Sequence, residues 1–207
     1  MVNVSKTEIV YFCNQSNNRC INLNINNIVM TSIKKLKFLG IYIDESLRWC
    51  DHIDHLCKKL NNANYAISNL KNSMPVNAVL NVYYGMVYSH LSYNVLLFGN
   101  STDAERVLIT QKRITCLYIK ENIHKLVKNV NYHSYATRNL NMWCIPKHRT
   151  TKFEASPAYQ GIKLFNHLPR KFLLVDYIQF KRNLKQLLLT KAYYSVQEFA
   201  SDNNLDE

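Results

Sequence analysis

The hydrophobic pattern near the N-terminus predicts three short β-strands. Residues 8–13 are rich in β-branched and aromatic side chains, and residues 21–25 alternate apolar and polar with a period of two, which is typical of a half-buried strand. Residues 14–18 would form the turn between them. Residues 36–43 predict the third strand, in which Gly40 would permit a bulge or the close approach of another backbone. We therefore expect the edge of a β-sheet here.

A helical period follows the strands. Apolar side chains recur with 3.6-residue spacing over residues 51–71, which predicts an amphipathic helix that ends before Pro75. A second and largely buried helix is predicted over residues 76–97. A third helix should begin near Thr102 or Asp103, since either side chain can cap a helix N-terminus.

The C-terminal part has less regular patterns. Residues 128–158 are expected to be irregular, and residues 159–167 to form a short helix that a proline ends. Asp176, followed three residues later by a glutamine, matches a capping box and predicts a basic helix to residue 192. The acidic tail from residue 201 is expected to be disordered.

These elements predict an α+β fold. A small N-terminal β-sheet edge is followed by a mainly helical bundle and by a C-terminal region that is partly irregular and partly helical. In the 207-residue chain we expect the sheet edge at residues 1–48, the helical bundle at 49–120, the basic C-terminal region at 121–192 and a tail at 193–207.

Positive charge is concentrated in one part of the chain. The net charge is +12, and between Arg106 and Lys191 there are 17 Lys and Arg residues against only Glu121, Glu154 and Asp176, a balance of +14. A regional basic excess is typical of a phosphate-binding surface, although a solvated basic face is the alternative. Aromatic residues lie between the positive charges and would either stack on bases or fill a core.

Cysteine usage and hydropathy limit the compartment. The six cysteines show no tight disulfide framework and the first 15 residues do not resemble a signal peptide, so we expect reduced thiols in a nuclear or cytoplasmic protein. The most apolar stretch, residues 76–98, is interrupted by Asn, Ser and His residues, which predicts a buried helix and no membrane partner.

Residues 50–57 hold the strongest candidate metal ligands. On a helix, Cys50, Asp54 and Cys57 would share one face while His52 and His55 share another. A structural zinc site needs four ligands that converge. We therefore expect no metal site here, with zinc as the minor alternative.

Three groups of motifs follow one another along the chain. Residues 37–44 read K-F-L-G-x-x-I-D and are followed by Leu47, Trp49, His52 and Ile53; residues 133–138 read H-x-Y-x-T-R; and residues 156–169 read S-P-x-Y-x-G-x-K-L-x-N-x-L-P. This order resembles the end of the palm, the thumb and the C-terminal region of non-LTR (LINE-type, jockey-like) retrotransposon reverse transcriptases. Further matching pieces are residues 89–93, 111–113 and 193–199.

The resemblance implies an RNA-directed DNA polymerase whose catalytic Y-x-D-D motif would precede residue 1. Residues 3–7 resemble the N-x-x-K-T element that follows this motif, which would place Lys6 near nucleotide phosphates. No Asp-Asp pair occurs in the sequence, so the ligands of the Mg²⁺ ions used by the parent family are absent and we expect neither a cofactor nor catalytic residues. The expectation is a truncated polymerase remnant, inactive on its own. The block after residue 113 is shorter than in the family, which leaves the packing of the second half open.

Any remaining activity would be weak, non-specific binding of RNA or DNA. The residues expected to contact phosphates, besides Lys6, are Lys112, Arg113, Arg138, Lys147, Arg149 and Lys152. Arg138 has a structural alternative, in which its guanidinium fixes an irregular loop.

Two other functional classes remain open. An inert fragment or protein-interaction module would use the basic face only as solvated surface, and strands without neighbours would favour self-association. A hydrolase centre would draw on Asp44, Asp51, Asp54 or a histidine, but the sequence supplies neither a nucleophile nor a third ligand for it.

Overall fold

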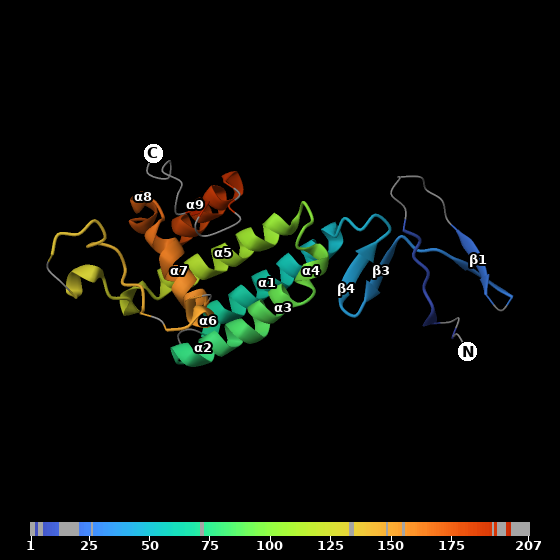
Figure 1. The fold of residues 1–207 in the computed structure, drawn as a ribbon, viewed down its shortest axis with the longest axis horizontal. Coiled ribbons are helices and arrows are strands. Elements are labelled where there is room, and N and C mark those ends of the chain that lie inside the picture. The colour runs from blue at the N-terminus through green and yellow to red at the C-terminus, as the bar shows by residue number, and fades with distance from the viewer. Residues whose placement is uncertain are drawn as a thin grey trace. The chain divides into compact units, whose positions relative to one another are not determined.

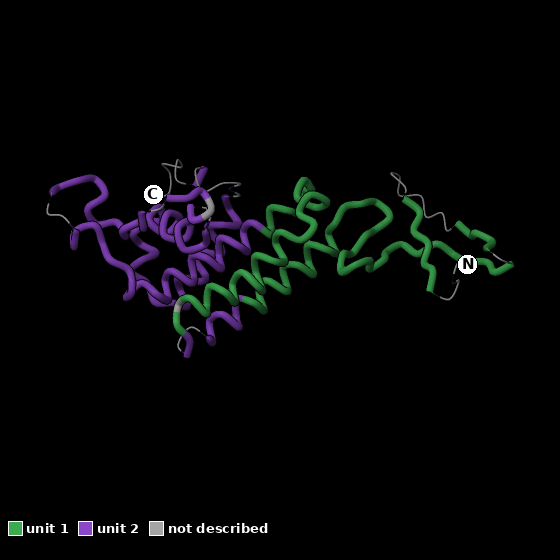
Figure 2. Tube along the Cα trace, turned by 60° about the horizontal axis from the view of Figure 1, so that its bottom comes forward, with its two compact units in different colours: residues 1–63, 75–107 green, residues 64–74, 108–207 purple. Residues whose placement is uncertain are grey.

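The protein has an α+β fold, in which two β-hairpins precede a series of helices (Figure 1). The chain divides into two compact units, residues 1–63 with 75–107 and residues 64–74 with 108–207 (Figure 2). The structure, a computed structural model, describes residues 3, 6–12, 21–25, 27–70, 73–132, 135–147, 149–154, 156–191, 193 and 198–199, without the side chains of residues 76 and 152. The predicted turn at 14–18 and the predicted disordered tail lie outside these residues.

The N-terminal strands form two separate hairpins. Strand β1 (Asn22–Ile25) pairs with β2 (Ile28–Thr31), and β3 (Lys35–Phe38) pairs with β4 (Ile41–Asp44), all antiparallel. The three strands predicted at a sheet edge are therefore replaced, among the described residues, by four strands in two sheets of two strands each. Only the strand at 21–25 was predicted at its observed place.

The stretch predicted as a single third strand reverses direction in its middle. Leu39 has a φ of 48° and Gly40 a φ of 84°. Positive φ at both central residues is the geometry of a type I′ turn, which joins two strands with the tightest hairpin connection. Gly40 therefore ends a strand where we expected it to accommodate a bulge. Within the described part of residues 8–13 no strand forms, although the Ile9 carbonyl accepts a hydrogen bond from the Ile33 amide at 2.7 Å.

Helix α1 (Cys50–Leu70) confirms the predicted first helix within one residue at each end. It buries Ile53, Leu56, Leu60 and Ala63, whose spacing of three and four residues places them on one face. The turn that precedes it is held by the Asp44 carboxylate.

The second predicted helix is neither continuous nor largely buried. Helix α2 (Val76–Tyr83) passes into a π-helical turn, η2 (Tyr84–Tyr88), and then into α3 (Ser89–Ser92), before the chain breaks and forms α4 (Val95–Phe98). A π turn adds one residue to the helical repeat, so the apolar positions after it rotate away from the buried face. Val87 within η2 and Phe98 in α4 are buried, while Leu96 in α4 is 93% exposed.

The second unit has a continuous apolar core. Helix α5 (Ala104–Glu121) supplies Cys116, Leu117 and Ile119 to it from its later turns. The other helices that supply buried side chains are α7 (Pro157–Asn166), α8 (Arg170–Leu173) and α9 (Tyr177–Thr190). Short elements, η3 (Ile123–Lys125), η4 (Asn129–Asn131) and α6 (Thr151–Glu154), interrupt the predicted irregular region.

The predicted N-cap at Asp176 is confirmed, but the reciprocal half of the capping box is not observed, because the Gln179 side chain donates to the Asn183 side chain at 2.9 Å. The Asp176 carboxylate accepts a hydrogen bond from the Gln179 amide at 2.9 Å at the start of α9. Helix α9 buries Phe180, Leu184 and Leu188 as its apolar spacing predicts. Among the described residues, no helix combines the length and the apolar character that crossing a membrane requires.

Candidate nucleic-acid interface

Four of the seven predicted phosphate contacts, Arg138, Lys147, Arg149 and Lys152, lie between α5 and α7 in the second unit. Figure 1 shows this segment, coloured yellow to orange, reaching outward from the helices α5, α7 and α9. We call residues 125–154 the basic segment. Its cations are Lys125, Lys128, Arg138, Lys147, Arg149 and Lys152, and Glu154 is its only acidic residue.

The basic segment folds back on itself through backbone hydrogen bonds. The Asn129 amide donates to the Met142 carbonyl and the Val130 amide to the Leu140 carbonyl, both at 3.0 Å, while the Cys144 amide donates to the Val127 carbonyl at 2.8 Å. The two arms of the segment are thereby held side by side without a regular hairpin.

Asn166 attaches this segment to the core. Its side-chain amide donates to the Trp143 carbonyl and accepts from the Trp143 amide, each at 2.9 Å. Asn129 adds a hydrogen bond from its side-chain amide to the Asn139 carbonyl at 2.8 Å, next to Arg138. Since buried or half-buried backbone groups must be paired, these two asparagines define the path of an otherwise irregular chain.

Arg138 is exposed, and its guanidinium makes no hydrogen bond or ion pair with the described residues. The structural alternative for Arg138 was that its guanidinium fixes an irregular loop. The hydrogen bonds of Asn129 and Asn166 fix this loop instead. Lys147 and Arg149 are exposed too, so three of the predicted residues present charge to solvent. Lys152 lies in α6, with its side chain outside the description.

Lys112 occupies a different environment. It is buried on α5, where its ammonium group donates a hydrogen bond to the Tyr193 carbonyl and lies 5.9 Å from the centre of the Tyr193 ring. These contacts give Lys112 a structural role in anchoring residue 193. Its neighbour Arg113 is half-buried. A phosphate contact by either residue stays a prediction.

Aromatic side chains accompany the exposed cations. Tyr132 is 68% exposed, Tyr135 is 79% exposed and Phe153 is 41% exposed. Flat exposed rings next to cations are the combination on which single-stranded nucleic acids stack while their phosphates are neutralised. Trp143 is half-buried under the Lys128 ammonium group, 5.1 Å from its ring centre.

The remaining predicted residue, Lys6, is exposed in the first unit, and its backbone amide donates to the Asn3 carbonyl at 3.1 Å. It belongs to a different unit from the other six predicted residues.

The carboxylates that were candidates for a hydrolase centre have structural partners. Asp51 is paired with Lys35 at 2.6 Å, and Asp54 is paired with Arg106 at 2.6 Å. Asp44 accepts hydrogen bonds from the Ser46 hydroxyl and from the amides of Arg48 and Trp49. Within the described residues, no three His, Cys, Asp or Glu side chains form a group able to hold a metal ion.

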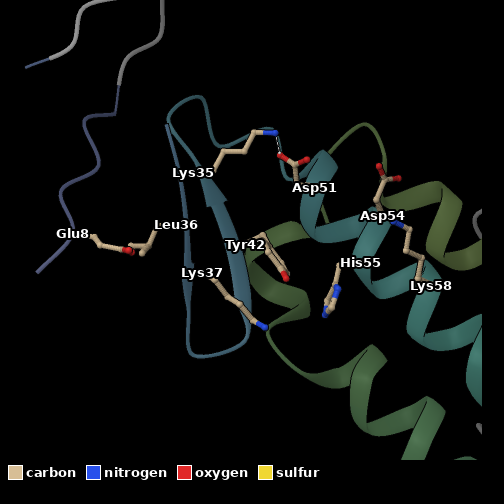
Figure 3. A pocket seen from close by; sticks show the side chains of 9 residues that line it. All are labelled: Glu8, Lys35, Leu36, Lys37, Tyr42, Asp51, Asp54, His55 and Lys58. Carbon is tan, nitrogen blue, oxygen red and sulfur yellow. Dashed lines mark ion pairs between the residues drawn. The ribbon is translucent and has the colours of Figure 1, made fainter. Parts of the chain in front are cut away.

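The first unit contains a pocket that the sequence did not predict. It has a volume of about 650 Å³ and lies between the β3–β4 hairpin and α1 (Figure 3). Its charged lining residues come from β3, from α1 and from the segment at Glu8, so no single sequence motif contains them. In the sequence, only the alternation of Lys35 and Lys37 on one strand pointed to such a pocket. The pocket residues are Glu8, Lys35, Leu36, Lys37, Tyr42, Asp51, Asp54, His55 and Lys58.

Comparisons with protein-family models, with curated proteins and with solved structures found no match for this chain.

Proposed function

We propose that this chain corresponds to the end of the palm, the thumb and the C-terminal region of a non-LTR retrotransposon reverse transcriptase, and that it binds nucleic acid with little sequence preference. The order of the sequence motifs supports the first part. The observation that carries the second is the basic segment, in which exposed Arg138, Lys147 and Arg149 lie among exposed aromatic rings on a chain that hydrogen bonds hold in place.

Binding would use phosphate neutralisation and stacking. Each exposed cation replaces condensed counterions on the nucleic acid backbone, so affinity depends on salt and carries no sequence information. The exposed tyrosines would stack on unpaired bases, which every base permits. Single strands are therefore expected to bind more tightly than duplexes of the same length.

Catalysis is not part of the proposal. Nucleotidyl transfer requires carboxylates that hold metal ions, and the sequence contains no Asp-Asp pair. The carboxylates Asp44, Asp51 and Asp54 are occupied by hydrogen bonds or ion pairs within the first unit.

Fluorescence anisotropy with labelled DNA and RNA of several sequences tests the proposal. Duplex affinity should fall by about a hundredfold between about 50 and 200 mM salt, the loss expected for roughly four phosphate contacts. Different sequences should give equal affinities within a factor of about three, because the contacts are to phosphates. Affinity that does not depend on salt, or that depends strongly on sequence, would refute it.

A second candidate function, a protein-interaction or self-associating module, is favoured by one observation in the first unit. Tyr84, Met86, Tyr88 and Leu97 on η2 and α4 are exposed, in addition to Leu96. Exposed apolar side chains close together in sequence are typical of interaction surfaces. Sedimentation equilibrium of the chain and of the Leu96→Ser variant tests this reading, since association through these residues would make the variant the smaller species.

A further inference from the structure

The pocket between the β3–β4 hairpin and α1 contains cations that the chain itself does not neutralise. Of its two aspartates, Asp51 is paired with Lys35 and Asp54 with Arg106, both at 2.6 Å. Lys37 and Lys58 are exposed and have no carboxylate within ion-pair distance among the described residues. Glu8, the third acidic lining residue, lies with Leu36 on the opposite side of β3 from His55 (Figure 3).

Two strands and one helix direct polar groups into the same space. The Lys37 ammonium group lies 5.4 Å from the centre of the Tyr42 ring, because these residues are directly paired across β3 and β4. The Tyr42 ring lies 4.9 Å from the His55 ring on α1. Figure 3 shows the Lys37 amine, the Tyr42 hydroxyl and the His55 ring directed into the space between hairpin and helix. Lys58 follows His55 by three residues and Asp54 by four on α1, and Figure 3 shows its amine extending toward Asp54.

The pKa of His55 shows which lysine charges reach the pocket. Burial is the largest cause that lowers the pKa of His55, and Lys59, Lys37, Lys58 and His90 lower it further. Lysine charges on β3 and on α1 therefore reach this imidazole, although Asp51 and Asp54 line the same pocket.

We propose that this pocket binds a terminal phosphate monoester, held by Lys37 and Lys58 and by the Tyr42 hydroxyl. A phosphate monoester carries nearly two negative charges at pH 7.5, which matches two ammonium groups, whereas a phosphodiester carries one. The pocket volume of about 650 Å³, which includes the space beside Glu8 and Leu36, exceeds what a phosphate group alone needs. Such a group occurs on a free mononucleotide or at the phosphorylated end of a nucleic acid strand.

The pocket and the basic segment belong to different units, so this inference does not depend on the proposed function. Its failure and that of the proposed function are distinguishable. Variants in the pocket should leave the salt dependence of oligonucleotide binding unchanged, and variants in the basic segment should leave phosphate binding in the pocket unchanged.

NMR titration of the full chain at pH 7.5 tests the inference, with AMP, adenosine and inorganic phosphate as probes. AMP should produce saturable shifts of the His55 ring signals with a dissociation constant of about 1 mM or lower. It should also raise the pKa of His55, since a nearby anion stabilises the imidazolium. Inorganic phosphate should shift the same signals, and adenosine should not.

Two variants and a control localise the site. Lys37→Gln and Lys58→Gln should each weaken AMP binding by about tenfold, the loss of one charge-assisted contact. Both side chains are exposed, so the variants should fold normally. Lys181→Gln, an exposed lysine on α9, should bind AMP as the parent chain does.

A dinucleotide with and without a 5′-phosphate separates the two sources. If only the phosphorylated dinucleotide binds as AMP does, strand ends fit the pocket; if AMP alone binds, a free mononucleotide is the ligand. Either result supports the phosphate monoester. Equal binding of both dinucleotides, equal shifts with adenosine, or unchanged affinity in both lysine variants would overturn the inference.

Discussion

Leu39 lies at the first position of the two-residue turn between β3 and β4, with a φ of 48° and 72% of its surface exposed. A left-handed conformation costs a residue with a bulky side chain about 1–2 kcal/mol relative to residues that tolerate it. Gly40, at the second position, has the conformational freedom that the turn requires. The Leu39 carbonyl accepts a hydrogen bond from the Tyr93 hydroxyl at 2.8 Å, which attaches the turn to the helical part of the first unit.

Replacing Leu39 by asparagine should stabilise this hairpin. Asn-Gly is the favoured type I′ pair, so we expect a gain of about 1 kcal/mol and exchange of the β3 and β4 amides slowed about fivefold. Amide hydrogen exchange measures this directly. Leu174→Asn is the control, because Leu174 is similarly exposed but has an ordinary φ of −85°. Exchange that accelerates in Leu39→Asn would show that the leucine side chain itself stabilises the turn.

The turn before α1 should respond to acid. Burial raises the pKa of Asp44, but the hydrogen bonds from Ser46 and from the amides of Trp49 and Arg48 together outweigh this and lower it below its ordinary value of 3.8. A lowered pKa in the folded state means that the carboxylate contributes stability above pH 3.8 and loses this contribution as the pH falls through the folded value. An NMR titration of the Asp44 carboxyl carbon should therefore have its midpoint below 3.8. A midpoint above it would contradict the hydrogen bonds described for this turn.

At the scale of elements, helices were predictable where one apolar face packs against a core. Helices α1, α7 and α9 follow the 3.6-residue spacing and the caps, so the sequence predicted them closely. The π turn η2 was not predictable, because inserting one residue into the repeat leaves no mark in composition. The β3–β4 turn was missed because its apolar residues continue the pattern of the strands across it.

Helix α7 packs closely against α5 at Gly161. A Cβ atom at this position would lie 2.7 Å from the Thr115 methyl group and 3.1 Å from Cγ1 of Ile119. Gly161→Ala should therefore destabilise the second unit by about 1–3 kcal/mol, the usual effect of overpacking, even though alanine is the better helix former. Urea unfolding followed by the fluorescence of Trp143, in a Trp49→Phe background that removes the other tryptophan, measures the change.

A second glycine and a rescue variant make this test specific. Gly85 lies in η2 with nothing near the position of a Cβ atom, so Gly85→Ala should not destabilise the chain. Thr115→Ser removes the methyl group but keeps the hydroxyl that donates to the Gln111 carbonyl, and it should restore part of the stability of Gly161→Ala. If both alanine variants have the same effect, close packing at Gly161 is not the cause.

At the scale of the whole molecule, the sequence predicted where positive charge is concentrated but not which cations are exposed. Lys112 was selected for its place in a family motif, and only the structure places it under Tyr193. Burial depends on contacts between residues 81 positions apart, which no local pattern encodes. Conversely, exposure of Arg138, Lys147 and Arg149 agrees with the role that the sequence predicted for them.

The most direct measurement of nucleic-acid binding by the basic segment compares two triple variants of equal charge. One is Arg138→Gln, Lys147→Gln and Arg149→Gln in the basic segment; the other is Lys181→Gln, Arg182→Gln and Lys185→Gln on α9, all six side chains being exposed. For a single-stranded oligonucleotide, the slope of log affinity against log salt should fall by about two units in the first variant, since each lost phosphate contact removes about 0.7. The α9 variant should keep the slope of the parent chain. Equal losses in both variants would mean that net charge alone attracts the nucleic acid, and would contradict a defined interface at the basic segment.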